Sequence, residues 1–176
     1  VYTDGNTVRK EAEKAFADLF ALKDEVERLN LELAGREDYE SEAYMKLLDK
    51  IHEKTELLAI RGENNIDREV EVVLKGLGFK PEDLDRNCEE FSGGWRMRIE
   101  LAKILLARPD IFLLEDPTNH LDIESISWLE SFLQTYSGAV VLVSHDRAFL
   151  DDCIDHVLSI NRADIPVSYT HLTLPT

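Results

Sequence analysis

Three short polar segments of the chain have residue types and spacing that suit phosphate chemistry. The first, the glycine segment, is Ser92-Gly93-Gly94, and it precedes an apolar stretch with the period of a helix. Two glycines let a backbone approach an anion closely, and the first amides of a helix point outward at the positive end of its dipole. The serine hydroxyl adds a donor. This segment predicts a phosphate contact, with an ordinary helix cap as the alternative.

The second, the acidic segment, is the adjacent pair Glu115 and Asp116, which ends the aliphatic run Ile111-Phe112-Leu113-Leu114. Carboxylates at the end of a buried parallel strand lie where α/β folds bind ligands. One carboxylate can hold Mg²⁺ while its neighbour orients an attacking water. The alternative is an acidic turn in which Asp122 caps the next helix.

The third, the histidine segment, is Ser144-His145-Asp146-Arg147, directly after the apolar run at residues 139–143. A histidine at that edge of a sheet can reach a terminal phosphate. The alternative is a strand-end histidine that hydrogen-bonds a neighbour.

The elements that position these segments alternate between apolar strands and helices. Strands are predicted at residues 111–114, 139–143 and 157–160. One helix is expected to open at residues 91–95 and to end near residue 107. Two more are expected from a cap at Asp122 to about residue 136, and from a cap at Asp146. Unbroken aliphatic strands between helices predict an α/β fold with a parallel sheet covered on both faces.

The N-terminal third has a helical pattern instead. Apolar residues recur in heptad spacing from Val8 to Leu33, which predicts one long helix, and Gly35 suits a left-handed position after it. A second helix is expected over residues 41–60, with an apolar stripe formed by Tyr44, Leu48, Ile51, Thr55 and Leu58. Two such helices joined by a short turn predict an antiparallel hairpin. A shorter helix is expected over 66–75.

Composition bounds the class of protein. The chain has 176 residues, with 20 Lys and Arg against 36 Asp and Glu, and a net charge of -16. This balance argues against a surface that coats nucleic acid. No apolar run approaches the roughly 18–20 residues that span a bilayer, so no membrane segment is expected. Two cysteines form no disulfide framework, which favours a reducing, cytoplasmic setting.

The C-terminal end departs from this pattern. Its last ten residues, VSYTHLTLPT, contain no charged residue and no amphipathic period. They resemble the translation of a transposase-adapter read. We therefore expect residues 166–176 to be an adapter-derived, non-native tail, and we leave them out of the functional argument.

The three segments, in this order, resemble the signature loop, Walker B strand with D-loop, and H-loop of the ATP-binding cassette (ABC) ATPases. The stretches FSGGWRMRIELAKILLARPDIFLL, PTNHLDIESISWLE and VLVSHDRAFL are similar to the ABC-F subfamily. Trp95 in place of glutamine, and Asn119-His120-Leu121-Asp122 in place of Ser-Ala-Leu-Asp, favour this subfamily over transporters. The resemblance is strong from about Leu77 to Leu150.

The resemblance implies part of a P-loop NTPase cassette, the first of two in one chain. Residues 1–62 would be the arm-like helical hairpin, and 63–109 the rest of the helical subdomain with the signature loop and its helix. Residues 110–165 would be the C-terminal part of the ATPase core. ABC-F proteins are soluble and cytoplasmic and act on the ribosome, so the implied partners are a second cassette of the same parent chain and the ribosome (rRNA and tRNA).

The resemblance also implies ATP and Mg²⁺ as ligands. Two cassettes sandwich two ATP molecules in this family, so the glycine segment would bind the γ-phosphate of ATP held by the opposite cassette. Glu115 would hold Mg²⁺, Asp116 would be the catalytic carboxylate, and His145 would contact the γ-phosphate. Asn119 and Asp122 would communicate across the interface between the cassettes.

The sequence departs from the family pattern in two places, and the first is the Walker A loop. No Gly-x-x-x-x-Gly-Lys-Ser/Thr loop occurs, because none of the eight glycines precedes a lysine. The chain is therefore expected to be a fragment that neither binds nor hydrolyses ATP well alone.

Two other classes stay open. One is the nucleotide-binding subunit of a membrane ABC transporter. The other is a non-enzymatic helical interaction module built on the hairpin, which is acidic, with 15 acidic against 9 basic residues in 1–60.

The family reads Asp-Glu where this chain has Glu115-Asp116. The metal position then carries a side chain one methylene too long, and the water-polarising position one too short. A misplacement of ~1 Å costs on the order of 100-fold in rate. We predict that a full-length chain with the Glu-Asp order hydrolyses ATP slowly, while the reversed pair is fast. Equal steady-state rates for the two versions would refute this.

Overall fold

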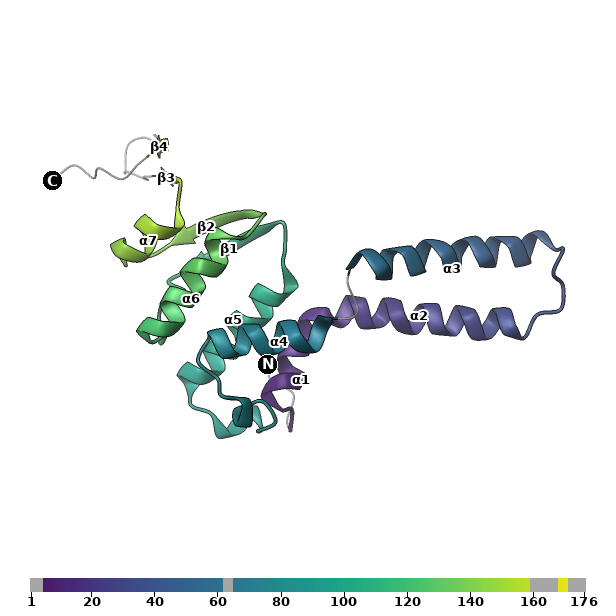
Figure 1. Cartoon of the computed structure of the whole chain (residues 1–176), viewed down its shortest axis with the longest axis horizontal. Helices are drawn as coiled ribbons and strands as arrows, with labels where there is room; N and C mark the ends of the chain where they lie inside the picture. Colours follow the sequence, from purple (N-terminus) through teal and green to yellow (C-terminus); the bar gives the residue numbers. More distant parts are fainter. Residues whose placement is uncertain (1–4, 62–64, 159–167, 171–176) are drawn as a thin grey trace. The chain divides into compact units, whose positions relative to one another are not determined.

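The computed structural model describes residues 5–61, 65–158 and 168–170 (Figure 1). The chain divides into two compact units. Unit 1 consists of residues 1–75 and 79–107, and unit 2 consists of residues 76–78 and 108–176. Each unit is described by itself below.

The first helical stretch of unit 1 is interrupted. Thr7 caps helix α1 (Val8–Glu13) by accepting a hydrogen bond from the Lys10 amide through Oγ1. A 3-10 turn, η1 (Lys14–Phe16), follows, and helix α2 (Ala17–Ala34) begins directly after it. The single helix predicted from the heptad pattern is therefore wrong at this point. Apolar spacing indicates which face of a helix is buried, but it does not reveal a short 3-10 turn between two α-helices.

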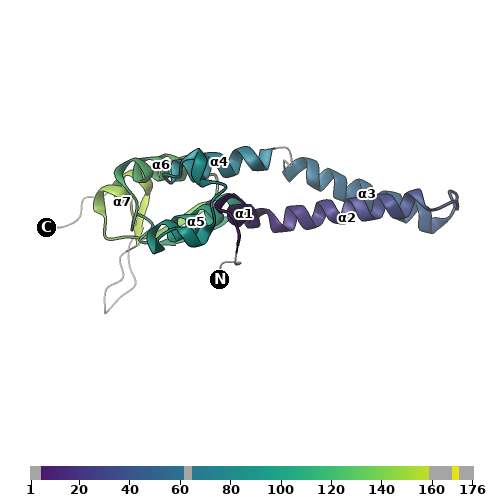
Figure 2. The same ribbon diagram turned by 90° about the horizontal axis from the view of Figure 1, so that it is seen from below.

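Helices α2 and α3 (Glu42–Arg61) lie side by side and antiparallel, as predicted (Figures 1 and 2). The two Glu25 carboxylate oxygens join them, one 2.7 Å from the Lys54 Nζ and the other 3.5 Å from the Lys50 Nζ. Leu47 is buried in this interface, whereas Leu48, which was expected on the stripe, is 36% exposed. The packed stripe of α3 is thus displaced by one residue at this point from the predicted one.

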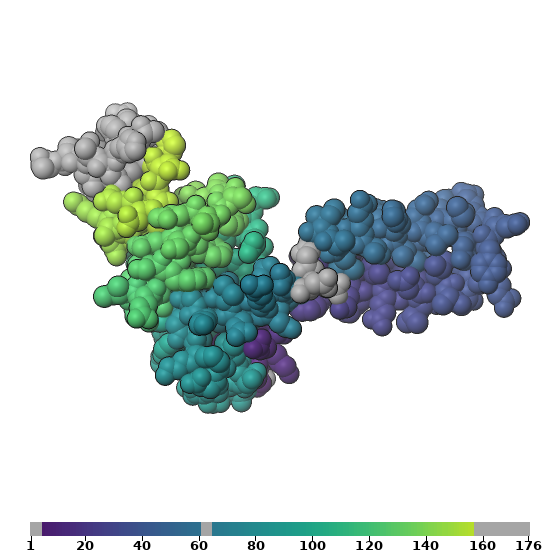
Figure 3. All heavy atoms as spheres, viewed as in Figure 1, coloured from purple at the N-terminus to yellow at the C-terminus, as the bar shows by residue number. Residues whose placement is uncertain are grey.

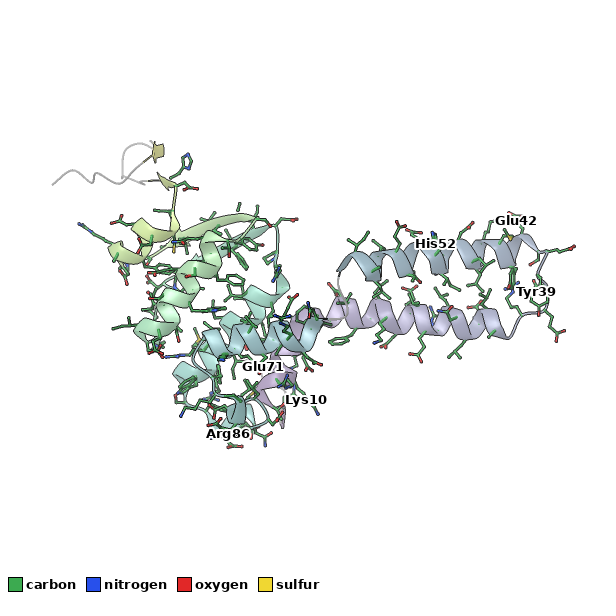
Figure 4. All side chains as sticks on the ribbon, in the orientation of Figure 1. Lys10, Tyr39, Glu42, His52, Glu71 and Arg86 are labelled. Atoms are coloured by element: carbon green, nitrogen blue, oxygen red, sulfur yellow. The ribbon has the colours of Figure 1, made fainter. Side chains whose placement is uncertain are left out.

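The turn of the hairpin is organised by a carboxylate and not by glycine. The Asp38 carboxylate accepts hydrogen bonds from the Arg36 guanidinium at 2.6 Å and from the Ser41 hydroxyl at 2.6 Å. Gly35 has a φ of -87°, so the expected left-handed conformation is wrong. Tyr39 and Glu42 mark this end of the hairpin in Figure 4. On the face shown in Figure 3, the hairpin stands clear of the teal helices of the same unit.

The rest of unit 1 is a helical core. Helix α4 (Ile66–Gly76) leads into two 3-10 turns, η3 (Pro81–Asp83) and η4 (Cys88–Glu90), and then into helix α5 (Gly93–Ala107). The segment before α1 is joined to this loop, because the Cys88 amide donates to the Asn6 carbonyl at 3.0 Å. The buried side chains of this core include Val8, Ala12, Val70, Leu74, Phe79, Ile99, Ala102 and Leu105.

Unit 2 is built on two parallel strands with helices between and after them. Strand β1 (Ile111–Glu115) pairs with β2 (Ala139–Val143), and helix α6 (Ile123–Gln134) connects them. Helix α7 (Arg147–Cys153) follows β2. These elements confirm the predicted α/β class.

The expectation of a sheet covered on both faces is wrong for the described residues. Burial alternates along β1, with Phe112 buried and Leu113 74% exposed. The buried face is the one that meets helix α6, because the Phe112 ring lies 4.3 Å from the ring of Tyr136 after this helix. The opposite face, with Ile111, Leu113, Val141 and Val143, is exposed in unit 2.

The third predicted strand also differs from expectation. Strand β3 (His156–Leu158) does not join the parallel sheet but pairs antiparallel with β4 (Ser168–Thr170). Residues 159 and 160 of the prediction lie outside the described residues. Strand β4 falls within the tail predicted at 166–176, whose other residues also lie outside the described part. The adapter origin of the tail stays a prediction.

The core of unit 1 contains a fully buried carboxylate, Glu11. Its oxygens lie 2.6 Å from the Lys14 Nζ and 3.1 Å from the Lys103 Nζ, and they accept a hydrogen bond from the Asn6 side-chain amide at 3.0 Å. Burial raises the pKa of Glu11, but the hydrogen bonds from Lys14, Asn6 and Lys103 outweigh burial and hold the pKa at about 2. This cluster joins α1, η1 and α5 through charges.

We predict that Glu11→Gln lowers the free energy of unfolding at pH 7 by about 3 kcal/mol, because it leaves two ammonium groups facing a neutral amide. A carboxyl whose pKa is lowered by folding stabilises the fold above its ordinary pKa, near 4.5. That stabilisation is lost as the pH falls toward 2. The stability gap between wild type and variant should therefore narrow at pH 3 in urea titrations.

The matched control is Glu56→Gln, which removes an exposed carboxylate from α3. It should change the free energy of unfolding by less than about 0.5 kcal/mol. Equal losses in the two variants would contradict the role assigned to the buried cluster.

Candidate functional site

The carboxyl ends of β1 and β2 meet at one edge of the parallel sheet. The register pairs Glu115 with Val143, the last residues of the two strands. Because the strands are parallel, the segments that follow them leave the sheet at the same edge. The acidic segment and the histidine segment, 29 residues apart in the chain, are therefore neighbours in unit 2.

Asp116 is the residue that holds this edge together. Its backbone amide donates to the Val143 carbonyl at 2.7 Å, which extends the strand pairing by one bond. Its carboxylate Oδ1 accepts a hydrogen bond from the His145 backbone amide at 3.2 Å. Its φ is +42°, a left-handed conformation that aspartate tolerates better than most residues. Asp116 thus fixes the loop after β2 through both its backbone and its side chain.

The loop after Asp116 is a series of tight turns that ends at a helix cap. The Asn119 amide donates to the Asp116 carbonyl at 3.1 Å, and His120 has a φ of +66°. Asp122 Oδ1 then accepts from the Ser125 amide at 2.9 Å and caps α6. The capping alternative considered for Asp122 is therefore present. Asn119 and Asp122 are both exposed.

The histidine segment is shaped by a second helix cap. Asp146 Oδ1 accepts hydrogen bonds from the Ala148 amide at 3.1 Å and the Phe149 amide at 3.3 Å, which starts α7. The Asp146 amide donates to the Ser144 hydroxyl at 3.1 Å. His145 is exposed at this turn. The backbone of the segment is thus held on both sides of a histidine whose ring faces solvent.

Glu115 is exposed at the end of β1, on the same face as Leu113. Within the described parts of the chain, no group of three or more His, Cys, Asp or Glu side chains could hold a metal ion. Mg²⁺ in nucleotide sites needs only one or two carboxylates, since phosphate oxygens and waters complete its coordination. The oxygen donors of Glu115 and Asp116 therefore fit Mg²⁺ that arrives with a nucleotide.

The glycine segment lies in unit 1, at the start of α5. The Arg96 amide donates to the Ser92 carbonyl at 3.0 Å, which begins the hydrogen-bond ladder of the helix. A Cβ atom added to Gly93 would meet nothing within 4 Å, and Ser92 is exposed. Packing within the chain therefore does not require glycine at position 93. The structure brings two of the three predicted segments together and places this one in the other unit.

Sequence reasoning missed an aromatic cluster beside the glycine segment. The Trp95 ring lies 4.9 Å from the ring of Phe79 and 6.4 Å from that of Phe91. Phe91 and Trp95 flank the glycine segment in the sequence, which was a signal, but the partner at Phe79 follows only from the tertiary structure.

Comparison with known proteins decides the family. A family model described as ABC transporter matches residues 2–119, about two thirds of the chain, including the glycine and acidic segments. The chain belongs to the ABC transporter family. The resemblance to ABC ATPases inferred from the motifs is confirmed.

Similar curated proteins are members of the F branch of the ABC family. ABC transporter F family member 5 of Arabidopsis thaliana is 40% identical over 149 residues, which cover 82% of this chain and 21% of that protein. ATP-binding cassette sub-family F member 3 of Rattus norvegicus is 41% identical over 133 residues, 76% of this chain and 18% of that protein. The chain thus spans about a fifth of the length of these ABC-F relatives.

A solved dimeric structure of a bacterial ABC transporter cassette supports the fold. The match covers 60% of this chain and 47% of that cassette chain, with a TM-score of 0.50 and 19% sequence identity. The ABC cassette fold predicted from the strands and helices is confirmed.

We predict that Asp116→Ala lowers the free energy of unfolding of unit 2 by about 2 kcal/mol, from the lost hydrogen bond and from alanine at positive φ. Asp116→Asn should stay within about 0.5 kcal/mol of wild type, because its amide oxygen can still accept from the His145 amide and asparagine tolerates this φ. Hydrogen exchange of the β1 and β2 amides measures unit 2 directly. Equal losses in both variants would show that the charge, and not the turn geometry, matters.

Proposed function

We propose that this chain is part of the first cassette of an ABC-F ATPase, which binds and hydrolyses ATP with Mg²⁺ and acts on the ribosome in the cytoplasm. The observation that carries the proposal is the hydrogen bond between the Asp116 carboxylate and the His145 backbone amide at the carboxyl edge of the sheet. It brings the carboxylate proposed to act on water and the histidine proposed to contact phosphate to one edge of the sheet in unit 2.

The residues of unit 2 have distinct proposed roles toward ATP. His145, exposed at the turn after β2, would donate to a γ-phosphate oxygen. Glu115 would hold Mg²⁺, which supplies positive charge that neutralises the phosphate oxygens when bound. Asn119 and Asp122, exposed on the loop before α6, would face the second cassette of the parent chain.

Asp116 would polarise the attacking water and accept its proton. One carboxylate oxygen is used by the His145 amide, and the other oxygen can act on a water. The hydrogen bond to the backbone orients the carboxylate, so little reorganisation is needed when the water is positioned. The shorter aspartate side chain keeps this group close to the strand end, which is consistent with the slow hydrolysis predicted above.

The glycine segment would act on the nucleotide held by the second cassette. Ser92, Gly93 and Gly94 would bind the γ-phosphate of ATP held by the second cassette, through helix amides and the serine hydroxyl. The exposure of Ser92 and the open space at Gly93 support this role, because a phosphate can approach without displacing a side chain.

The hairpin of α2 and α3 would extend toward ribosomal RNA or protein. Glu25 ties the two helices together by ion pairs with Lys50 and Lys54, and the acidic composition of residues 1–60 gives no basic grip for RNA. No helix among the described residues is long and apolar enough to cross a membrane.

The proposal predicts that, in the full-length parent chain, Asp116→Asn lowers kcat for ATP hydrolysis at least about 100-fold. Ser92→Ala should lower it as well, because one phosphate donor is lost. The Asp116→Asn protein should still co-sediment with ribosomes when ATP is present, since binding precedes hydrolysis.

The matched control is Ser131→Ala, which removes an exposed hydroxyl that bonds only within α6, to the Ser127 carbonyl. It should leave kcat unchanged. If Asp116→Asn hydrolyses ATP at the wild-type rate, Asp116 is not the catalytic carboxylate. If the wild-type parent chain hydrolyses ATP but does not co-sediment with ribosomes, the proposed action on the ribosome is excluded.

A further inference from the structure

The first turn of helix α5 is supported by aromatic rings that meet edge to face. The Trp95 ring meets the Phe79 ring at an angle of 64° with 4.9 Å between centroids. Phe79 in turn meets the Phe91 ring edge-on at 5.7 Å. Phe79 is almost fully buried in unit 1, and the Trp95 indole packs against its ring. Such edge-to-face pairs hold rings in defined orientations.

The other support of Trp95 is a buried cation. The Arg98 guanidinium carbon lies 4.4 Å from the centroid of the Trp95 ring, and Arg98 is only 8% exposed. A desolvated guanidinium over an indole interacts more strongly than an exposed one. The indole is therefore held by a ring from the preceding loop and by a charge from the next helical turn.

The loop before the glycine segment is cross-linked by contacts of one arginine. The Arg86 guanidinium, labelled in Figure 4, lies 4.6 Å from the Phe91 ring centroid. It also bonds the Asp83 carboxylate at 2.7 Å and the Glu90 carboxylate at 3.0 Å. These contacts tie Asp83, Glu90 and Phe91 to one another in the loop that enters the glycine segment.

Between Phe91 and Trp95 the chain has little means of its own to hold position. Gly93 and Gly94 have no side chains, and the space beside Gly93 is open. The helical ladder begins only with the bond from the Arg96 amide to the Ser92 carbonyl. Trp95 is therefore the first side chain of α5 that can anchor the turn from which the early amides project.

We propose that Trp95 is a positioning residue, which sets the direction of the Gly93 and Gly94 amides toward a nucleoside triphosphate by packing between Phe79 and Arg98. The inference rests on the proposed function of the glycine segment and adds the device that aims it. In this arrangement the half-buried Trp95 side chain is engaged by Phe79 and Arg98, so it acts through the backbone and not by touching the nucleotide.

The first test uses hydrogen exchange of this chain. In Trp95→Gln, the Arg96 amide, which donates to the Ser92 carbonyl, should exchange at least about tenfold faster than in wild type, while amides 99–106 of α5 keep their protection. Trp95→Phe, which retains a ring against Phe79, should restore slow exchange. Faster exchange throughout α5 in Trp95→Gln would mean that the helix is lost. In that case Trp95→Leu, which keeps an apolar side chain, is used as the test variant in place of Trp95→Gln. Unchanged exchange of the Arg96 amide in Trp95→Gln, or in Trp95→Leu where that variant replaces it, overturns the proposal.

The second test measures ATP hydrolysis by the full-length parent chain. Trp95→Gln should lower kcat about tenfold or more with less than threefold change in KM, and Trp95→Phe should recover most of it. The matched control is Trp128→Phe, at the other tryptophan of the chain, which packs on Phe132 in unit 2 and should have wild-type kinetics.

The kinetics separate two kinds of failure. If Ser92→Ala lowers kcat and Trp95→Gln does not, the glycine segment binds phosphate and the positioning role of Trp95 is wrong. If neither variant changes turnover, the proposed function of the glycine segment itself fails. Equal kcat in Trp95→Gln and Trp95→Phe also overturns the proposal, because the ring would then contribute nothing.

Discussion

The parallel pairing of β1 and β2 is the constraint on which the site in unit 2 depends. Because the register ends at Glu115 and Val143, the residues that follow each strand must leave the sheet together. The chain then adds two bonds through Asp116, one from its amide to the Val143 carbonyl and one to its carboxylate from the His145 amide. A slip of one residue in the strand register would move the side chains of one strand to the opposite face of the sheet. The arrangement of the site therefore depends on the register of β1 and β2.

In unit 1, the helices are held together around a buried charge and beside a pair of glycines. Glu11 is fully buried and balanced by two ammonium groups, which fixes α1 and η1 against α5. At the other end of α5, Trp95 packs between a ring and a guanidinium where the backbone has two glycines. In α5, Lys103 is therefore held by a carboxylate from α1, and Trp95 by a ring from the preceding loop and a guanidinium one turn along the helix.

Much of this organisation is readable from local pattern. The bounds of β2 and the caps at Asp122 and Asp146 agree with the prediction, and α3, β1 and the end of α5 lie within about one residue of it, because each depends on neighbouring residues. The errors have a common origin in tertiary contacts. The packed face of α3 is decided by α2, and the partner of β3 is a strand ten residues further on, so spacing alone predicted neither.

The sequence by itself determined the family, the order of the three segments and the residue types at the site, because motif chemistry is carried by identity and spacing. It also determined the class of each helix and parallel strand through apolar periodicity. Only the tertiary structure decided that the Asp116 carboxylate meets the His145 amide across 29 residues, and that Trp95 meets Phe79. Such contacts depend on register and helix packing, which are set by burial over the whole unit and leave no local signal in the sequence.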